Sequence, residues 1–337
     1  MRPPRSALAA LVALAALLLV GCQQPSTPSA TPEAAATKVT VGLTYIPNIQ
    51  FSPWYVATDK GLIDPSVAVT LRHHGQSEGL FNALVAGQEN FIIAGGDELM
   101  QARAAGMDLV AIASYYRTYP VELIVKDSSA IKSLADLKGK KIGLPGKYGE
   151  SWFGLKVALA NANLSESDVQ IVEIGYTQQA ALATDKVDAV VGYANNEAVQ
   201  FALAGIPVRG IGIDPAGAPP LVSISLISTR AYLDSHPDVA KKVVSGLKAG
   251  IEAVAKNPDE AITISAKQVP TLNTDAAKAA AKATLTATIK LMTKPDGAVD
   301  LKLDAAQWAA MATFMKAKGL VATQVDPTKA MSTAYVS

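Results

Sequence analysis

The order of apolar segments along the chain is the feature that most limits what it can fold into. Apolar runs of strand length alternate with helical segments over residues 39–114, and the same alternation starts again at residue 121 and ends near residue 213. This alternation is typical of parallel βα units in an open sheet. One more strand is predicted at 221–228, and every later segment has the 3.6-residue apolar spacing of a helix. The sequence therefore predicts the α/β class, with two sheet units and a helical C-terminal part.

Four C-terminal helices are predicted from this spacing and from the polar residues at their starts; they cover residues 237–255, 259–266, 274–292 and 304–318. Helices without strands of their own cannot easily form a domain beside two α/β units, so we expect them to pack on the first unit. The chain then passes between two lobes twice, near residues 119–125 and 220–226. Two passages form a hinge, and a ligand cleft lies between hinged lobes. The expected limits are residues 38–120 and 226–337 for the first lobe and residues 121–225 for the second.

The first 37 residues are predicted to lie outside the folded part. Two arginines precede an apolar run at 7–20, which is too short to span a bilayer and has the features of a secretory signal. Its last residues, Leu-Val-Gly-Cys at 19–22, resemble the bacterial lipobox, in which the peptide is cut before the cysteine and the thiol receives a diacylglycerol. We predict a lipoprotein signal at 1–22 and a flexible linker, rich in Pro, Ser, Thr and Ala, at 23–37.

The cysteine and histidine content limits the available chemistry. Cys22 is the only cysteine, which argues against the alternative of an ordinary signal with a chance cysteine. The folded part then has no disulfide, Cys-based metal site or thiol nucleophile. His73 and His74 are adjacent in a predicted strand and point to opposite faces, so we expect no metal site there. We expect no cofactor, and a net charge of +1 without a basic stripe makes nucleic acid an unexpected partner.

Aromatic residues are concentrated in the part of the chain that carries the predicted sheets. Eight of the ten tyrosines lie at or before Tyr193, and most of these follow predicted strands. Ligands of open α/β sheets bind beyond the carboxyl ends of strands, where aromatic side chains stack on a planar ring. The alternative for each residue is core packing with one polar tip in water. The aromatic candidates are Tyr45, Tyr115, Tyr116, Tyr148, Trp152, Tyr176 and Tyr193.

Polar residues at predicted loop-to-helix junctions complete the candidate site. Free backbone N–H groups at 146–152, with the Ser151 hydroxyl, suit an anion or a carbonyl oxygen, although Ser151 is equally suited to cap the helix. The neighbouring Glu150 disfavours an anion, so a neutral ligand with carbonyl groups fits better. Amide or carboxylate contacts to ring N–H and C=O groups are expected from Asn48, Asp97, Asn195 and Glu197, with Asn195 or Asn196 alternatively capping a helix.

Several motifs, in order, resemble the NMT1/THI5-like family of thiamine-precursor and sulfonate binding proteins. Residues 38–48, Lys-Val-Thr-Val-Gly-Leu-Thr-Tyr-Ile-Pro-Asn, are similar to the opening strand of that family. The segment Asp-Leu-Lys-Gly-Lys-Lys-Ile-Gly at 136–143 is the strongest match, and Lys-Val-Asp-Ala-Val-Val-Gly-Tyr at 186–193 is another. Weaker matches at 54–61, 80–87, 91–97 and 308–321 extend the resemblance over nearly the whole mature chain.

This resemblance implies a periplasmic-binding-protein (type II) fold, with two α/β lobes joined by a two-strand hinge. It also implies an extracytoplasmic monomer, held at the bacterial cell membrane only by its lipid, that binds a small-molecule ligand and works with the permease and ATPase of an ABC importer. The stretch Tyr-Ile-Pro-Asn-Ile-Gln-Phe at 45–51 is most similar to the pyrimidine and riboflavin uptake branch, which favours riboflavin and adds Phe51 to the ligand contacts.

Other functions remain as alternatives. A thiamine pyrimidine precursor, formylaminopyrimidine or hydroxymethylpyrimidine, is the second choice of ligand, and a sulfonate is the third. Eukaryotic relatives that synthesise the thiamine pyrimidine resemble one another in a cysteine cluster, which this chain lacks, so we expect a binding protein and not an enzyme. A sensor domain is disfavoured because no transmembrane or output segment follows the last helix.

Overall fold

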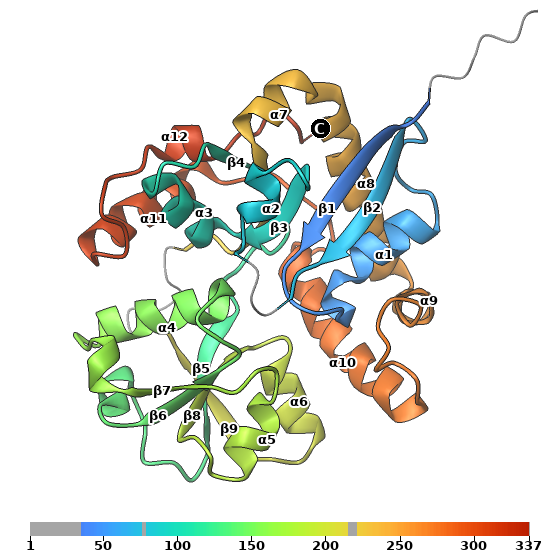
Figure 1. Ribbon diagram of the computed structural model, residues 1–337. Helices are drawn as coiled ribbons and strands as arrows, with labels where there is room; N and C mark the ends of the chain where they lie inside the picture. Colours follow the sequence, from blue (N-terminus) through green and yellow to red (C-terminus); the bar gives the residue numbers. More distant parts are fainter. Residues whose placement is uncertain (1–34, 76–78, 215–220, 337) are drawn as a thin grey trace, which may run out of the picture. The chain divides into compact units, whose positions relative to one another are not determined.

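Two five-stranded sheets organise the chain in a computed structural model, which describes residues 35–75, 79–214 and 221–336 (Figure 1). The first sheet has the order β2-β1-β3-β10-β4 and consists of β1 (Thr37–Leu43), β2 (Val67–His73), β3 (Phe91–Gly95), β4 (Leu109–Ser114) and β10 (Ile224–Thr229). The second has the order β7-β6-β8-β5-β9 and consists of β5 (Val121–Lys126), β6 (Lys141–Leu144), β7 (Gln170–Glu173), β8 (Ala189–Tyr193) and β9 (Val208–Gly212). The chain therefore has the predicted α/β class.

Both sheets are mixed, which corrects the expectation of parallel strands alone. Strands β1, β2 and β3 are parallel, as are β6, β7 and β8. In contrast, β10 runs antiparallel between β3 and β4, and β5 runs antiparallel between β8 and β9. The reason is that β5 and β10 each follow a passage of the chain from one sheet to the other. Neither strand is therefore the return of a βα unit, and the handed crossover that makes neighbours parallel is missing.

Helices lie on both sheets, and turn-forming residues mark where these helices begin and end. Those near the first sheet are the 3-10 helix η1 (Ile49–Phe51), α1 (Ser52–Asp59), α2 (Asn82–Val85) and α3 (Gly96–Ala104). Those near the second are η2 (Leu134–Leu137), α4 (Gly149–Asn161), η3 (Glu166–Asp168), α5 (Gln178–Ala183) and α6 (Glu197–Leu203). Gly61 has a φ of 61° just beyond α1, where an L side chain would be strained, so glycine stops this helix at its C-terminus.

The C-terminal third is helical, as predicted, and most of it packs on elements of the first sheet. It comprises α7 (Arg230–Ser235), α8 (Pro237–Lys256), α9 (Pro258–Ser265), α10 (Asp275–Met292), α11 (Ala305–Ala317) and α12 (Pro327–Ala330). Side-chain caps start five of these six helices, through Thr229, Asn257, Thr274, Asp304 and Asp326. Helices α8 and α9 contact α1, and α12 contacts β4. Helix α10 contacts both η1 and α6, so it joins the elements of the two sheets.

Within the described residues the chain passes between the sheets between β4 and β5 and again between β9 and β10. We propose the corresponding lobe limits, with residues 38–120 and 226–337 as the first lobe and residues 121–225 as the second. One apolar cluster spans both, because Leu99 and Leu109 belong to the same buried group as Val121 and Phe153. The lobes therefore share part of a core where α3 contacts α4.

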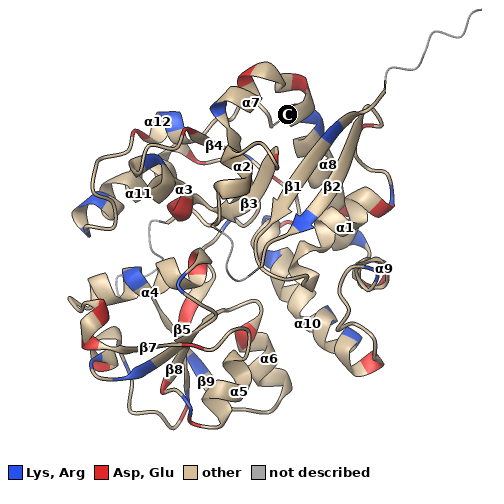
Figure 2. Ribbon diagram, in the orientation of Figure 1, with Lys and Arg blue, Asp and Glu red and all other residues tan. Residues whose placement is uncertain are grey.

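Two further features concern the surface and the membrane. Lys and Arg are interspersed with Asp and Glu over the helices of both lobes (Figure 2). None of the helices within the described ranges is long and apolar enough to cross a membrane. The predicted signal and Cys22 lie outside the described residues.

Candidate functional site

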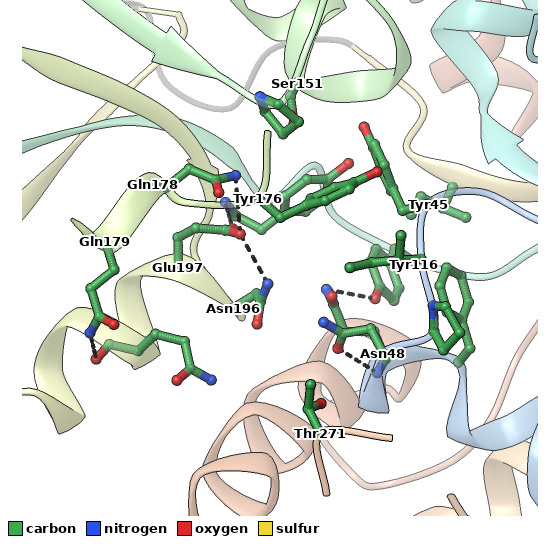
Figure 3. A pocket seen from close by; sticks show the side chains of 18 residues that line it. Tyr45, Asn48, Tyr116, Ser151, Tyr176, Gln178, Gln179, Asn196, Glu197 and Thr271 are labelled. Carbon is green, nitrogen blue, oxygen red and sulfur yellow. Dashed lines mark hydrogen bonds between the residues drawn. The ribbon is translucent and has the colours of Figure 1, made fainter. Parts of the chain in front are cut away.

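A cavity of about 320 Å³ lies where the carboxyl ends of strands from both lobes meet. Tyr45 follows β1, Tyr116 follows β4, Tyr176 follows β7, and Tyr193 is the last residue of β8. Because parallel strands end at one edge of a sheet, this arrangement gathers aromatic side chains that are far apart in the sequence. All four line the cavity, and Figure 3 labels Tyr45, Tyr116 and Tyr176 there.

Tyr45 has an unusual backbone conformation at the first-lobe edge of the cavity. Its φ of 69° is rare for a bulky residue, and such conformations cost roughly 1–3 kcal/mol and cluster at functional sites. The ring lies 6.0 Å from the rings of both Tyr148 and Tyr176, edge-on to the latter. Burial and the nearby Glu98 carboxylate raise the pKa of the Tyr45 phenol, so it stays a neutral hydrogen-bond donor.

The segment after Tyr45 forms a second part of the first-lobe wall. The side-chain oxygen of Asn48 accepts a hydrogen bond from the Gln50 backbone N–H at 3.2 Å and caps η1. The Asn48 amide nitrogen has no protein partner within the described ranges and is available to a ligand. Phe51 lines the same wall.

Tyr115 and Tyr116 form a stacked pair behind this wall, with ring centroids 5.2 Å apart. Tyr116 faces the cavity, whereas Tyr115 lies one layer deeper and donates from its hydroxyl to the Gln50 carbonyl oxygen at 2.8 Å. Burial raises the pKa of both phenols. Tyr116, backed by Tyr115, therefore presents a neutral aromatic surface to the cavity.

The second lobe contributes Tyr176, Tyr193 and Ser151 to the opposite wall. The Tyr148 hydroxyl donates to the Tyr176 hydroxyl oxygen at 3.1 Å, which orients the Tyr176 ring. The hydroxyls of Tyr45 and Tyr193 are buried and lie near each other, and neither makes a hydrogen bond of good geometry within the described part of the chain. Buried polar groups are normally paired, so these two hydroxyls are candidates for ligand contact.

Glu197 is the only charged side chain among the described residues that line the cavity. Its carboxylate accepts hydrogen bonds from the Tyr193 backbone N–H at 2.8 Å, from the Asn196 amide nitrogen at 3.0 Å and from the Gln178 amide nitrogen at 3.4 Å. Burial raises the pKa of this carboxyl group, while the donors oppose that shift. The cavity thus presents no cation to an anionic ligand.

The structure brings eight of the predicted site residues to the cavity: Tyr45, Asn48, Phe51, Tyr116, Ser151, Tyr176, Tyr193 and Glu197. Ser151 is the third residue of α4 and makes no capping bond, so the alternative that it caps this helix is wrong. Asn196 occupies the N-cap position of α6, but its side chain turns to Glu197 and does not cap.

Five predicted residues do not line this cavity, because neighbouring protein groups hold their side chains elsewhere. Asp97 is buried and accepts a hydrogen bond from the Tyr119 hydroxyl at 2.6 Å. Tyr115 lies behind Tyr116, and Asn195 donates to the Thr288 hydroxyl oxygen at 2.9 Å. Tyr148 and Trp152 line a separate hollow beside Lys147 and Lys156, whose ammonium groups lie 5.0 and 5.6 Å from the Trp152 ring.

Sequence reasoning missed the glutamines of the second-lobe wall, Gln178, Gln179 and Gln200, and the first-lobe residue Thr271. The glutamine pair follows Tyr176 at the start of a helix, directly after a strand, which is the position used to select the other candidates. Gln200 lies one helical turn after Asn196, so the two share a face of α6. The four-residue spacing between Asn196 and Gln200 is therefore the signal from which Gln200 could have been predicted.

Comparisons with known proteins connect these features to one family. Residues 48–261 match the family model described as NMT1/THI5 like. The riboflavin-binding protein RibY of Chloroflexus aurantiacus is 33% identical over 267 residues, which are 75% of this chain and 76% of that protein. The formylaminopyrimidine-binding protein of Halalkalibacterium halodurans is 24% identical over 306 residues, covering 90% of this chain and 91% of that protein.

Two further proteins bear on fold and on catalysis. The alkanesulfonate-binding protein SsuA of Xanthomonas axonopodis pv. citri, bound to MOPS, has a TM-score of 0.67 at 22% identity and covers 89% of this chain and 99% of that chain. This likeness shows the periplasmic-binding-protein fold. A Legionella pneumophila protein named 4-amino-5-hydroxymethyl-2-methylpyrimidine phosphate synthase is 23% identical over 242 residues, 71% of this chain and 76% of that protein. Binding proteins and a synthase are therefore both among its relatives.

Proposed function

The chain belongs to the NMT1/THI5-like family, and from this premise we propose that it is the solute-binding lipoprotein of an ABC importer and captures riboflavin in the cavity between its lobes. One observation carries the proposal: tyrosines from both lobes face one cavity that has no cation in its described lining. Aromatic stacking contributes about 0.5–1.5 kcal/mol per ring beyond area burial. Several tyrosines therefore supply a substantial part of the ~8–12 kcal/mol of a μM to nM complex.

The charge of the cavity supports a neutral ligand over a sulfonate. Anion sites use Arg, Lys or helix N-termini that carry free N–H groups. Here the charged residue in the described lining is the carboxylate of Glu197, and no Arg or Lys lies there. A sulfonate would meet this carboxylate with no cation to compensate its charge, so the fold relationship to SsuA does not support a sulfonate as the ligand of this chain.

A thiamine pyrimidine precursor is the second candidate, because the formylaminopyrimidine-binding relative covers 90% of the chain. A pyrimidine is also flat and neutral, but one ring occupies less of a cavity that is walled by tyrosines from two lobes. The size of the aromatic surface therefore favours a ligand with several fused rings.

We propose binding without chemistry on the ligand. The eukaryotic pyrimidine-forming relatives resemble one another in a cysteine cluster, whereas the only cysteine here is Cys22 in the predicted signal. Because a Legionella relative is named as a synthase, we propose to test this chain directly for turnover. Iron-dependent turnover by the purified protein would contradict the proposal.

We also propose the cellular setting that the sequence predicts. Acylation of Cys22 would hold the protein at the outer face of the cell membrane, and residues 23–37 would act as a tether. The partners are then the permease and the ATPase of the importer, and the protein works as a monomer. A single diacylated cysteine provides two acyl chains, which is enough for stable anchoring.

The test is a pair of titrations of the purified protein without its signal. Stacking on tyrosine quenches flavin fluorescence, so riboflavin should lose fluorescence on binding with a dissociation constant in the μM to nM range, about 8–12 kcal/mol. Formylaminopyrimidine is titrated by calorimetry in parallel. Clear heat with the pyrimidine and no quenching with riboflavin would replace the riboflavin proposal with the pyrimidine one.

A further inference from the structure

Four side-chain amides form one wall of the cavity in the second lobe, and we call Gln178, Gln179, Asn196 and Gln200 the amide wall. Gln178 and Gln179 are the first two residues of α5. Asn196 occupies the N-cap position of α6, and Gln200 lies one turn further along that helix. Figure 3 shows Gln178, Gln179 and Asn196 around Glu197, on the side of the cavity away from Tyr45 and Tyr116.

All four amide nitrogens of the wall are already bound to protein acceptors. Gln178 and Asn196 donate to one oxygen of Glu197, at 3.4 and 3.0 Å. Gln179 donates to the backbone carbonyl oxygen of Gln200 at 2.9 Å. Gln200 itself donates to the Thr284 hydroxyl oxygen at 3.0 Å.

The chemistry of these partners fixes the orientation of three of the four amides, and Gln200, whose partner is a hydroxyl that can donate or accept, is the exception. An ionised carboxylate and a backbone carbonyl only accept hydrogen bonds, so the nitrogens of Gln178, Asn196 and Gln179 must face them. The carbonyl oxygens of the four amides then have no hydrogen-bond partner within the described part of the chain. The wall is therefore an array of acceptors around a carboxylate.

An acceptor array selects a ligand group that donates. A chain of hydroxyl groups fits, since each O–H can donate to a carbonyl oxygen of the wall. A phosphate ester does not fit, because its oxygens at neutral pH are acceptors and its charge adds to that of Glu197. An unmatched acceptor in a closed cavity also loses its hydrogen bond to water.

We propose that the amide wall is a subsite for an uncharged polyhydroxyl chain attached to the ring system of the ligand, and that it rejects the phosphate ester of the same ligand. This inference rests on the proposed function, in which the tyrosines hold the rings. For a flavin, the wall takes the ribityl chain. Glu197 acts as a positioning residue, because it holds the amides of Gln178 and Asn196 with their oxygens toward the ligand.

The experiment compares three fluorescent flavins on one protein: riboflavin, lumichrome, which lacks the hydroxylated chain, and FMN, which carries a phosphate. We expect lumichrome to bind about tenfold more weakly than riboflavin, and FMN about a hundredfold more weakly. Gln179→Met keeps the side-chain length but removes the acceptor. This variant should bind riboflavin about tenfold more weakly and should bind lumichrome with unchanged affinity.

Two more variants separate recognition from folding. Glu197→Gln removes the charge and should reduce the ratio of the FMN and riboflavin dissociation constants by about tenfold. Gln170→Met makes the same substitution at an exposed glutamine of β7, away from the cavity, and should change none of the three affinities. Thermal unfolding of each variant shows whether it is folded.

The possible outcomes distinguish this inference from the proposed function. Equal affinity for riboflavin and lumichrome, or for riboflavin and FMN, overturns the amide-wall subsite while the flavin-binding function stands. Absence of quenching by every flavin overturns the proposed function, and the subsite for a flavin chain falls with it. The expected order, together with the loss of discrimination in Gln179→Met, supports both.

Discussion

The hydroxyl of Tyr45 in the first lobe lies against the backbone of Gly149 in the second, so closely that a Cβ on Gly149 would overlap with it. Gly149 also has a φ of 70°, which favours glycine. This contact joins the strained loop after β1 to the first turn of α4, at the cavity. The meeting of the two lobes therefore depends on a position without a side chain.

Gly149→Ala should destabilise the protein and weaken ligand binding. The φ penalty costs roughly 1–2 kcal/mol, and the overlap with Tyr45 adds to it by separating the lobes. Gly205→Ala is a matched control, since Gly205 has a φ of 65° and no atom near its added Cβ. We expect both variants to lower the melting temperature but only Gly149→Ala to weaken riboflavin. Equal effects on binding would contradict a role for the Tyr45–Gly149 contact.

Tyr176→Ala should weaken riboflavin by about tenfold, since stacking contributes about 0.5–1.5 kcal/mol beyond area burial and ~1.4 kcal/mol is a factor of ten. Tyr176 is half-buried, so its removal disturbs the core less than the loss of Tyr116 would. Tyr176→Phe keeps the ring and loses only the bond from Tyr148, so it should retain most of the affinity. Fluorescence titration gives the riboflavin affinity of the wild type and of both variants. An unchanged affinity in Tyr176→Ala would show that this ring does not contact the ligand.

The buried acids between α3 and α4 should make stability fall as the pH rises. Burial raises the pKa of Asp97 to about 7 and that of Glu98 to about 8, and it raises that of Glu150 well above its usual range. Tyr119 and Ser223 donate to Asp97 and Glu150, and Lys156 partly offsets the negative charge.

For an acid with a raised pKa, the folded protein binds more protons than the unfolded chain between the two pKa values. The contribution of these groups to stability is therefore fully present below about pH 4 and is lost as the pH rises toward about 8. We expect a melting temperature at least about 4 °C higher at pH 5 than at pH 8, because one pKa unit is about 1.4 kcal/mol and 1 kcal/mol shifts a domain of this size by about 2–4 °C.

Glu150→Gln isolates the contribution of this cluster from other buried acids. Glu122, in β5, has a pKa that burial raises to about 7 and contributes to the same slope. Glutamine mimics the protonated acid, so the variant should flatten the pH dependence and be more stable than the wild type at pH 8. A slope that is unchanged in Glu150→Gln would show that the interlobe acids do not carry it.

Cys22→Ala should abolish labelling by radioactive fatty acid and release soluble protein that still binds its ligand, because the thiol is the predicted point of acylation. A serine near the same end, as in Ser26→Ala, serves as the control that keeps the label. Retention of Cys22→Ala in the membrane fraction would contradict lipid anchoring.

Local patterns were sufficient to predict elements but not their spatial order. The predicted helix at 237–255 is observed as Pro237–Lys256, and the short turn at 134–137 as Leu134–Leu137. Strand β10 was also expected, but its insertion between β3 and β4 depends on pairing with residues more than a hundred positions earlier. The apolar pattern of a buried strand does not encode its direction.

In the candidate site, too, local patterns predicted some residues, whereas others depend on contacts with distant parts of the chain. Tyr45, Tyr176 and Tyr193 were predictable because strand ends define one edge of a sheet. Asn195 and Asn196 are adjacent and chemically identical, yet only Asn196 faces the cavity, because Asn195 is held by Thr288 in α10. The sequence contains no local signal for a partner that lies 93 residues away.

The bond between Asn195 and Thr288 is also the basis of the last prediction. Thr288 is fully buried, donates to the Thr284 carbonyl oxygen at 2.8 Å and accepts from Asn195. Thr288→Val preserves the shape but leaves the Asn195 amide unpaired in the interior, at a cost of about 1–3 kcal/mol.

Because α10 belongs to the C-terminal helices and Asn195 to the second lobe, Thr288→Val should loosen the contact between the two parts, weaken riboflavin binding and lower the melting temperature. Thr286→Val is the matched control on the same helix, since Thr286 is exposed and bonds only to the Lys282 carbonyl oxygen. Calorimetric unfolding and fluorescence titration of both variants test the prediction. If Thr288→Val lowers stability without changing affinity, the bond supports folding alone, and the arrangement of the cavity walls depends on the Tyr45–Gly149 contact instead.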